Sequence, residues 1–162
     1  MRGWRWRGHS AMLRGGLRRA VKGISPVSEH TAILFANEAF YRAFADRDAK
    51  AMDELWSREA AVTCLHPGWG PLEGRQEVME SWQRILANEA SPAVTCRRPR
   101  VFVHSAIAIV ICYEQIEGQL LVATNMFRHE GRHWRLIHHQ AGPTAVQLPE
   151  EEEAPAEAPK PN

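Results

Sequence analysis

The segment from Val94 to Gln140 restricts the possible folds more than any other part of the chain. Two acid-glycine pairs, Glu117-Gly118 and Glu130-Gly131, interrupt it, and such pairs between β-rich runs are typical of tight hairpin turns. The β-rich runs themselves are Val94–His104, Ala106–Ile116, Gln119–His129 and Arg132–Gln140. The segment therefore predicts an antiparallel meander.

The two turns also predict which side chains share a face of the sheet. A tight turn at Glu117-Gly118 places Cys112 opposite Ala123, and one at Glu130-Gly131 places Ala123 opposite His138. Directly opposed residues share a face, and His139 is expected to point the other way by alternation. The first face is therefore expected to carry Val110, Cys112, Glu114, Ala123, Asn125, Phe127, Trp134, Leu136, His138 and Gln140.

The opposite face of the predicted sheet is also apolar. A sheet with only one face on the core would alternate apolar and polar residues, so both faces are expected to be covered. The helices suffice for one face, and a second copy of the chain is the simplest cover for the other. We therefore predict a homodimer through the convex face, which carries Ile107, Ile109, Ile111, Tyr113, Leu120, Val122, Met126 and Ile137.

Three helices are predicted ahead of the meander. The first starts near Ser25-Pro26, because serine suits the N-cap and proline the first helical position. Asp48 caps a second helix over residues 49–56, and a third covers about residues 74–88. A short strand is expected over residues 61–66. Helices followed by antiparallel strands indicate an α+β domain.

The ends of the chain differ in composition from this domain. Residues 1–24 are rich in glycine and arginine, and residues 148–162 in proline, glutamate and alanine. Both are predicted to be disordered and to flank a domain at 25–147. The basic arm resembles a transit peptide or a surface tether, and Met12 is an alternative start site. Nothing downstream is typical of a nucleic-acid-binding module, and no run of about 20 apolar residues predicts a membrane span. We expect neither nucleic acid nor membrane as a partner.

The three cysteines give no sign of a metal centre or a disulfide framework. Cys64, Cys96 and Cys112 are widely spaced and lie in apolar, strand-like runs. This pattern favours buried free thiols in a reducing, cytoplasmic environment. No HExxH motif occurs, and the adjacent His138 and His139 cannot both face one ion from a regular strand. We expect no metal and no cofactor.

The stretch HPGWGP, residues 66–71, is the first candidate for a functional site. His66 is either a general base at a pocket or a structural histidine that bonds a turn carbonyl. Trp69 either forms a rigid lip of a pocket or plugs the core. The glycines and prolines around it favour the lip slightly, because a core plug does not need such a turn.

The second candidate is the polar group on the first face of the sheet. His138 is the expected acid or base, with Glu114 as its orienting partner or as the base itself, and Asn125 and Gln140 beside them. Tyr41 is a candidate hydroxyl donor to the pocket. The alternative is a satisfied internal network, because unpaired burial would cost roughly 1–3 kcal/mol for each group. Trp82 and Phe127 are candidate apolar contacts to a ligand, and a purely core position is the alternative for Trp82.

Several of these pieces occur together in one known family. The motifs are His66-Pro67-Gly68-Trp69, Gly74-Arg75 with Ser81-Trp82, Ala123-Thr124-Asn125, and Trp134 through His139. With the order of elements, they make residues 27–144 resemble the SnoaL-like branch of the nuclear transport factor 2-like superfamily. The resemblance implies a curved antiparallel sheet wrapped around the helices as a cone, with a pocket at its open end and dimerisation through the convex face.

The resemblance does not select one activity. The superfamily includes ketosteroid isomerases, polyketide cyclases, scytalone dehydratase and limonene epoxide hydrolase, and also non-catalytic transport and kinase-association domains. Close relatives typically end in His-x-His-x-Ser, where this chain has Gln140 and Gly142 in the last two places. Two functions therefore stay open. One is proton-transfer chemistry on a small, largely apolar molecule, and the other is a non-catalytic module for dimerisation or partner binding.

Overall fold

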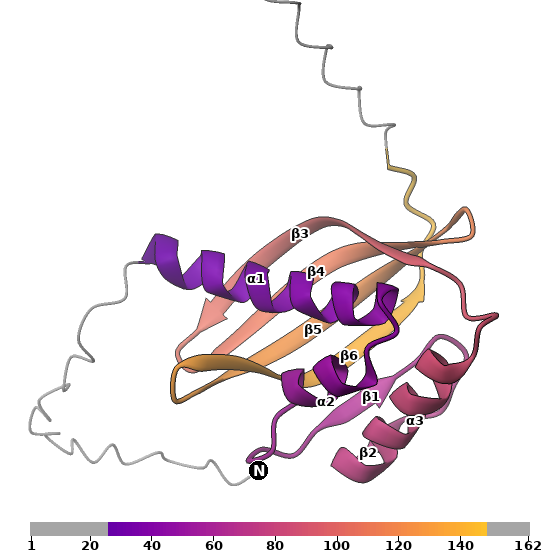
Figure 1. Cartoon of the computed structure of the whole chain (residues 1–162). Helices are drawn as coiled ribbons and strands as arrows, with labels where there is room; N and C mark the ends of the chain where they lie inside the picture. Colours follow the sequence, from indigo (N-terminus) through magenta and orange to yellow (C-terminus); the bar gives the residue numbers. More distant parts are fainter. Residues whose placement is uncertain (1–25, 149–162) are drawn as a thin grey trace, which may run out of the picture.

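The computed structural model describes residues 26–148 (Figure 1). The predicted basic arm at 1–24 lies outside this range, as does the predicted acidic tail at 148–162 except for Leu148. The boundaries proposed for these segments therefore stay predictions.

Three helices form where the sequence predicts them. They are α1 (Pro26–Ala45), α2 (Ala49–Leu55) and α3 (Arg75–Ala87). Asp48 caps α2, since its carboxylate accepts a hydrogen bond from the backbone N–H of Ala51 at 2.9 Å. No helix within residues 26–148 is long and apolar enough to cross a membrane.

The strands form one six-stranded sheet in the spatial order β2-β1-β6-β5-β4-β3. The predicted antiparallel meander is present as β3 to β6, and the parallel pairing of the short β1 with β6 makes the whole sheet mixed. All other neighbours are antiparallel. The strands are β1 (Thr63–Leu65), β2 (Leu72–Glu73), β3 (Val94–His104), β4 (Ile107–Ile116), β5 (Gln119–Glu130) and β6 (His133–Pro143).

The sheet is curved, and α1 lies across its concave face (Figure 1). The face of α1 toward the sheet carries Ile33, Asn37 and Phe40, which are buried. Met52 of α2 and Trp82 of α3 extend the same core. The α+β class and the cone-like wrapping of the sheet around the helices are thus confirmed.

The first predicted hairpin is confirmed in register. Cys112 pairs with Ala123 and Glu114 with Leu121. Glu117 and Gly118 both have positive φ, at 48° and 80°, as a two-residue type I′ turn requires.

The predicted register of the second hairpin is wrong. Its loop is Gly131-Arg132, so that Phe127 pairs with Leu136 instead of Trp134. This shift of two residues leaves each side chain on its predicted face of the sheet. A β-bulge later in β6, however, moves the residues beyond it to the opposite face. Met126 pairs with His138, so Ile137 is an extra residue in β6.

The bulge reverses the predicted directions of the residues that follow it. His139 and Ala141, not His138 and Gln140, lie opposite the inward-facing residues of β5 and are buried. His138 and Gln140 lie on the outer face instead.

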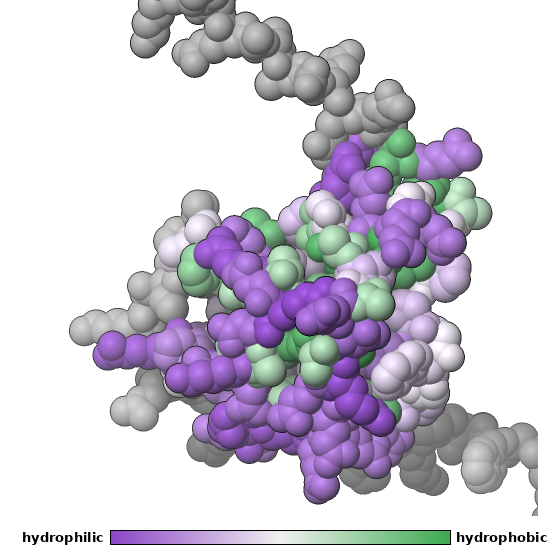
Figure 2. Space-filling view, turned by 45° about the vertical axis from the view of Figure 1, so that its right-hand side comes forward, coloured by the Kyte–Doolittle hydropathy of each residue, from purple (hydrophilic) through white to green (hydrophobic). Residues whose placement is uncertain are grey.

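The outer face of the sheet, which faces away from α1, carries apolar side chains that are only partly covered within one chain. Ile107, Ile109 and Ile111 are half-buried. Val122 and Phe102, which belong to the same face, are 38% and 43% exposed. Elsewhere the surface is more polar, and the side of the domain shown in Figure 2 is mainly hydrophilic with smaller hydrophobic patches.

Candidate functional site

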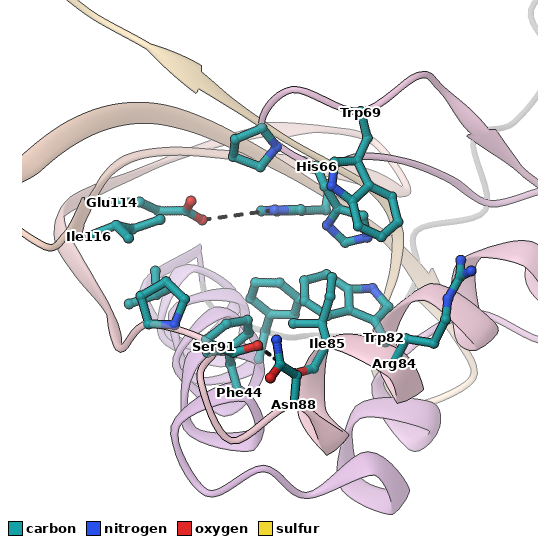
Figure 3. Close-up of a pocket in the computed structure, with 15 residues that line it drawn as sticks. Phe44, His66, Trp69, Trp82, Arg84, Ile85, Asn88, Ser91, Glu114 and Ile116 are labelled. Atoms are coloured by element: carbon teal, nitrogen blue, oxygen red, sulfur yellow. Dashed lines mark hydrogen bonds and ion pairs between the residues drawn. The ribbon is translucent and has the colours of Figure 1, made fainter.

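A pocket of about 510 Å³ opens between α1, α3 and the concave face of the sheet. Figure 3 shows the aromatic rings of Phe44 and Trp82 on one wall, with Glu114 reaching the pocket from the opposite wall. The lining is largely apolar and consists of Phe40, Phe44, His66, Pro67, Trp69, Trp82, Arg84, Ile85, Asn88, Ser91, Pro92, Val94, Glu114, Ile116 and His139. Its volume and composition are those of a small-molecule site.

Glu114 is a buried carboxyl group at the end of this pocket. Strand alternation in β4 points it inward, and only 3% of its surface is exposed. Burial raises the pKa of Glu114 from 4.5 to about 7, because the charged form loses its hydration. The Tyr41 hydroxyl donates a hydrogen bond to Glu114 Oε1 at 2.9 Å and opposes part of this increase. Glu114 can therefore gain or lose a proton near neutral pH.

His139 lies beside Glu114, with its Nε2 3.9 Å from Glu114 Oε1. Its Nδ1 is 2.7 Å from Asn125 Oδ1. The amide nitrogen of Asn125 donates to Asn37 Oδ1 at 2.8 Å and to Tyr41 at 3.2 Å, so the amide oxygen must face the imidazole. His139 Nδ1 therefore carries the hydrogen, and Nε2 presents a free lone pair toward Glu114.

The pKa of His139 is lowered to about 3, first by burial and then by the neighbouring His66 and His138. The ring is consequently neutral at physiological pH. A neutral imidazole therefore lies next to a carboxyl group that titrates near pH 7, and the carboxyl group is the stronger base of the two.

His66 is a second neutral imidazole in the wall. Its Nε2 lies 2.9 Å from Ser81 Oγ, and that hydroxyl donates to the carbonyl of Val78 at 2.7 Å. The serine oxygen must then accept from Nε2–H, which leaves Nδ1 unprotonated. Burial, followed by the charge of Arg84, lowers the pKa of His66 to about 4.

Trp69 borders the mouth of the pocket. It is 46% exposed, and its ring meets that of His66 edge-on at 4.9 Å. Gly68 before it has a φ of +78°, a conformation that glycine adopts without strain. The guanidinium carbon of Arg84 lies 5.7 Å from the centre of the Trp69 ring, within the range of a cation–π contact.

The structure brings only some of the predicted site residues together. His66, Trp69, Trp82 and Glu114 line the pocket. Tyr41 and Asn125 lie behind it as hydrogen-bond partners, and Phe127 is buried without reaching the lining. The two residues displaced by the bulge do not reach the pocket: His138 Nδ1 bonds Thr63 Oγ1 at 2.7 Å, and Gln140 is exposed.

The sequence interpretation missed His139 and Asn37. His139 was excluded by strand alternation, and no residue type around Ile137 signals the bulge that breaks it. Asn37 is not among the candidates from the sequence, because no local feature indicates that its amide meets Asn125.

No group of three or more His, Cys, Asp or Glu side chains within residues 26–148 is arranged to hold a metal ion. Cys64, Cys96 and Cys112 are free thiols. The indole N–H of Trp82, a residue that lines the pocket, is buried without an acceptor from the described part of the chain.

A curved sheet wrapped around helices, with an apolar pocket at its open end, defines the class of cone-shaped α+β ligand-pocket domains. Within that class the chain belongs to the SnoaL-like domain family, whose model matches residues 33–145. The resemblance stated from the sequence is thereby confirmed.

Solved structures extend this result. A protein of the NTF2-like family from Streptomyces avermitilis, provisionally assigned as a dehydratase, is 33% identical. The match covers 75% of this chain and all of that one, with a TM-score of 0.69. A protein from Thiobacillus denitrificans, provisionally assigned as a calcium/calmodulin-dependent protein kinase type II association domain, is 28% identical with a TM-score of 0.60. That match covers 67% of this chain and 92% of the other.

A curated plant protein is also similar. It is the F-box protein SKIP8 of Arabidopsis thaliana, at 28% identity over 128 residues. The match covers 74% of this chain, which spans about half, 55%, of the length of the plant protein.

Proposed function

We propose that the pocket binds a small, largely apolar molecule and that Glu114 transfers a proton to or from it. The observation that supports this most is a single buried carboxyl group at the end of an apolar pocket of about 510 Å³. Because the pKa of Glu114 is about 7, both the acid and the base form are populated at physiological pH. General acid–base catalysis is most efficient under that condition.

His139 has a supporting role in this proposal. Its Nε2 lone pair faces Glu114 Oε1 at 3.9 Å and can orient the carboxyl group in its protonated form. The pKa of His139, about 3, is far below that of Glu114, so the proton taken from a substrate stays on the carboxyl group, which can return it to the product. The Asn37–Asn125–His139 chain of hydrogen bonds fixes the ring, so that it does not have to reorganise during the reaction. We assign Glu114 as the catalytic residue and His139 as a positioning residue.

The reaction classes that fit are isomerisation, dehydration and cyclisation of the kind that begins with removal of a proton from carbon. The provisional assignment of the Streptomyces avermitilis relative as a dehydratase supports the same class. The free thiols support a cytoplasmic location for the protein.

The probe 5-nitrobenzisoxazole tests this proposal without knowledge of the natural substrate. A carboxylate in an apolar pocket removes its C3 proton, the ring N–O bond breaks, and a coloured phenolate forms. The wild-type protein should accelerate this reaction about 10²-fold over Glu114→Gln, in line with the usual contribution of a general base. The rate should rise with pH through about 7, because the carboxylate is the active form.

His138→Gln is the matched control, because this histidine lies outside the pocket and should leave the rate unchanged. Equal rates for the wild type and Glu114→Gln would rule out Glu114 as the base.

We further propose that two copies of the chain associate through the outer face of the sheet. Half-buried Ile107, Ile109 and Ile111, with exposed Phe102 and Val122, form an apolar surface that one chain leaves open. The provisional assignment of the Thiobacillus denitrificans relative as an association domain supports this second function. The two functions use different faces of the sheet and are compatible.

A further inference from the structure

Arg84 gives the mouth of the pocket a positive charge that the pocket chemistry described so far does not use. Arg84 is a lining residue of the pocket, and its guanidinium carbon lies 5.7 Å from the centre of the Trp69 ring. No carboxylate among residues 26–148 lies within ion-pair distance of it. An exposed arginine that contacts an aromatic ring but has no anionic partner retains all five N–H donors for a ligand.

The charge lies at the opposite end of the pocket from Glu114. Figure 3 shows Glu114 and Ile116 on one side, and Trp69 and Arg84 on the other. The wall between them is apolar and includes Phe44, Trp82 and Ile85. A ligand that fills the pocket therefore meets a cation at one end and the buried carboxyl group of Glu114 at the other.

The other polar groups near the mouth contribute little charge. The hydroxyl of Ser91 is already committed, since it donates to the carbonyl of Ile85 at 2.7 Å. Asn88 is neutral, and its side-chain oxygen accepts from the backbone of Ala90 at 3.1 Å. One guanidinium group matches one carboxylate, with two parallel hydrogen bonds. A phosphate would carry more charge than this single cation balances.

We propose that Arg84, held against Trp69, forms a carboxylate-binding subsite and that the ligand of the pocket is an apolar carboxylic acid. This rests on the proposed function, to which it adds the substrate class and its orientation. The carboxylate contacts Arg84 at the mouth, and the apolar body extends toward Glu114. The reverse orientation is disfavoured, because a ligand carboxylate would then meet the ionised form of Glu114 in a poorly hydrated space.

The test uses 2-naphthoate and its uncharged analogue methyl 2-naphthoate, with binding measured by isothermal titration calorimetry at pH 7.5. The wild-type protein should bind the acid at least about tenfold more tightly than the ester, since hydrogen bonds between two charged groups are stronger than those to a neutral ester. Arg84→Gln should remove this preference and leave ester affinity within about twofold of the wild type. Arg84→Lys should retain part of the preference, because it keeps the charge but not the planar fork.

Arg42→Gln is the control variant, because this arginine is exposed on α1, bonds Glu38 and does not line the pocket. It should bind both probes as the wild type does. Equal affinity of the wild type for acid and ester would overturn the subsite and leave the proposed function standing. A loss of both probes in Arg84→Gln would also overturn it, since the arginine would then act on the pocket as a whole. Failure of the wild type to bind either probe would contradict the apolar pocket itself.

Discussion

At Glu114, burial and hydrogen bonding act on the same carboxyl group in opposite directions. Burial raises its pKa, and the hydrogen bond from Tyr41 lowers it, with burial the larger effect. The phenol hydroxyl also lies 3.1 Å from Cys112 Sγ, and burial raises its own pKa well above 10, so it remains a donor at physiological pH. The acidity of one residue is thus set jointly by α1 and the sheet.

The raised pKa of Glu114 predicts a pH-dependent difference in stability between the wild type and Glu114→Gln. The folded-state value, about 7, exceeds the ordinary value of 4.5, so the folded protein binds this proton more tightly than the unfolded chain. The resulting stabilisation is fully present below about pH 4.5 and is lost as pH rises through about 7. Relative to Glu114→Gln, the wild type should lose up to about 3 kcal/mol between pH 4.5 and pH 8.5.

Urea unfolding of both proteins across this pH range measures the difference. His139 has a lowered pKa and contributes a loss of stability on acidification instead, but both proteins share it, so it cancels. A pH-independent difference would show that the carboxyl group titrates normally in the folded state.

Truncation of Trp69 tests whether this side chain is a lip or a plug. Because the ring is 46% exposed, Trp69→Ala should cost less than about 1 kcal/mol of unfolding free energy. It should also weaken the binding of methyl 2-naphthoate. Trp56→Ala is the comparison, since Trp56 is 1% exposed and its truncation should cost about 3–5 kcal/mol. A loss in that larger range for Trp69→Ala would show that the ring supports the core.

At the scale of elements, the position of α3 depends on its first residue. Arg75 Nη2 donates to the Asp53 carbonyl at 2.9 Å and to its carboxylate at 2.6 Å. Nη1 donates to the carbonyls of Trp56 and Ser57, both at 3.2 Å. One side chain therefore attaches the start of α3 to the end of α2. Because α3 carries Trp82 and Arg84, this attachment also positions these two pocket residues.

Arg75→Met should consequently destabilise the domain by about 2 kcal/mol, because it leaves these half-buried acceptors without their charged donor. Arg75→Lys should recover only part of the loss, since a single ammonium cannot reach the same set of acceptors. Arg42→Met, which breaks an exposed i,i+4 pair, should cost less than about 0.5 kcal/mol. Chemical denaturation measures all three, and equal costs for Arg75→Met and Arg42→Met would contradict the fixing role.

The elements also show which features could be predicted from the sequence and which could not. Helical periodicity, the Asp48 cap and the Glu117-Gly118 turn act locally, and the elements they predict are present. The bulge at Ile137 results from how β6 fits β5 over its whole length, and it carries no local composition signal. The sequence analysis therefore placed Glu114 and Asn125 correctly on the inner face of the sheet, but it placed His138 beside them where the structure has His139. The raised pKa of Glu114 likewise depends on helices remote in sequence that exclude water from it.

At the scale of the whole molecule, the apolar outer face of the sheet predicts self-association. Ile109 is half-buried at its centre, between Phe102 of β3 and Met126 of β5 in the pairing of the strands. Ile109→Glu places a charge there, and a buried unpaired charge opposes dimer formation by several kcal/mol. Sedimentation velocity at micromolar concentration should show a dimer for the wild type and a monomer for this variant.

Gln83→Glu on the exposed side of α3 adds the same charge away from this face and should remain a dimer. A wild-type protein that sediments as a monomer would contradict the predicted homodimer. The proposed pocket chemistry would be unaffected, since all of its residues belong to one chain.

The bulge at Ile137 also affects how well the pocket tolerates the insertion of a residue into β6. It decides which of two adjacent histidines meets Asn125. If the bulge straightened, or if one residue were inserted ahead of it and β6 slid along β5, His138 would occupy the place of His139. An imidazole would still face Glu114, because the two neighbours are identical. In a scan of single-residue insertions along β6, the probe reaction should therefore survive best for an insertion directly ahead of Ile137, because Trp134 and Leu136 then keep their buried positions. The two adjacent histidines are therefore redundant: after a shift of one residue in the register of β6, one of them still supplies the imidazole.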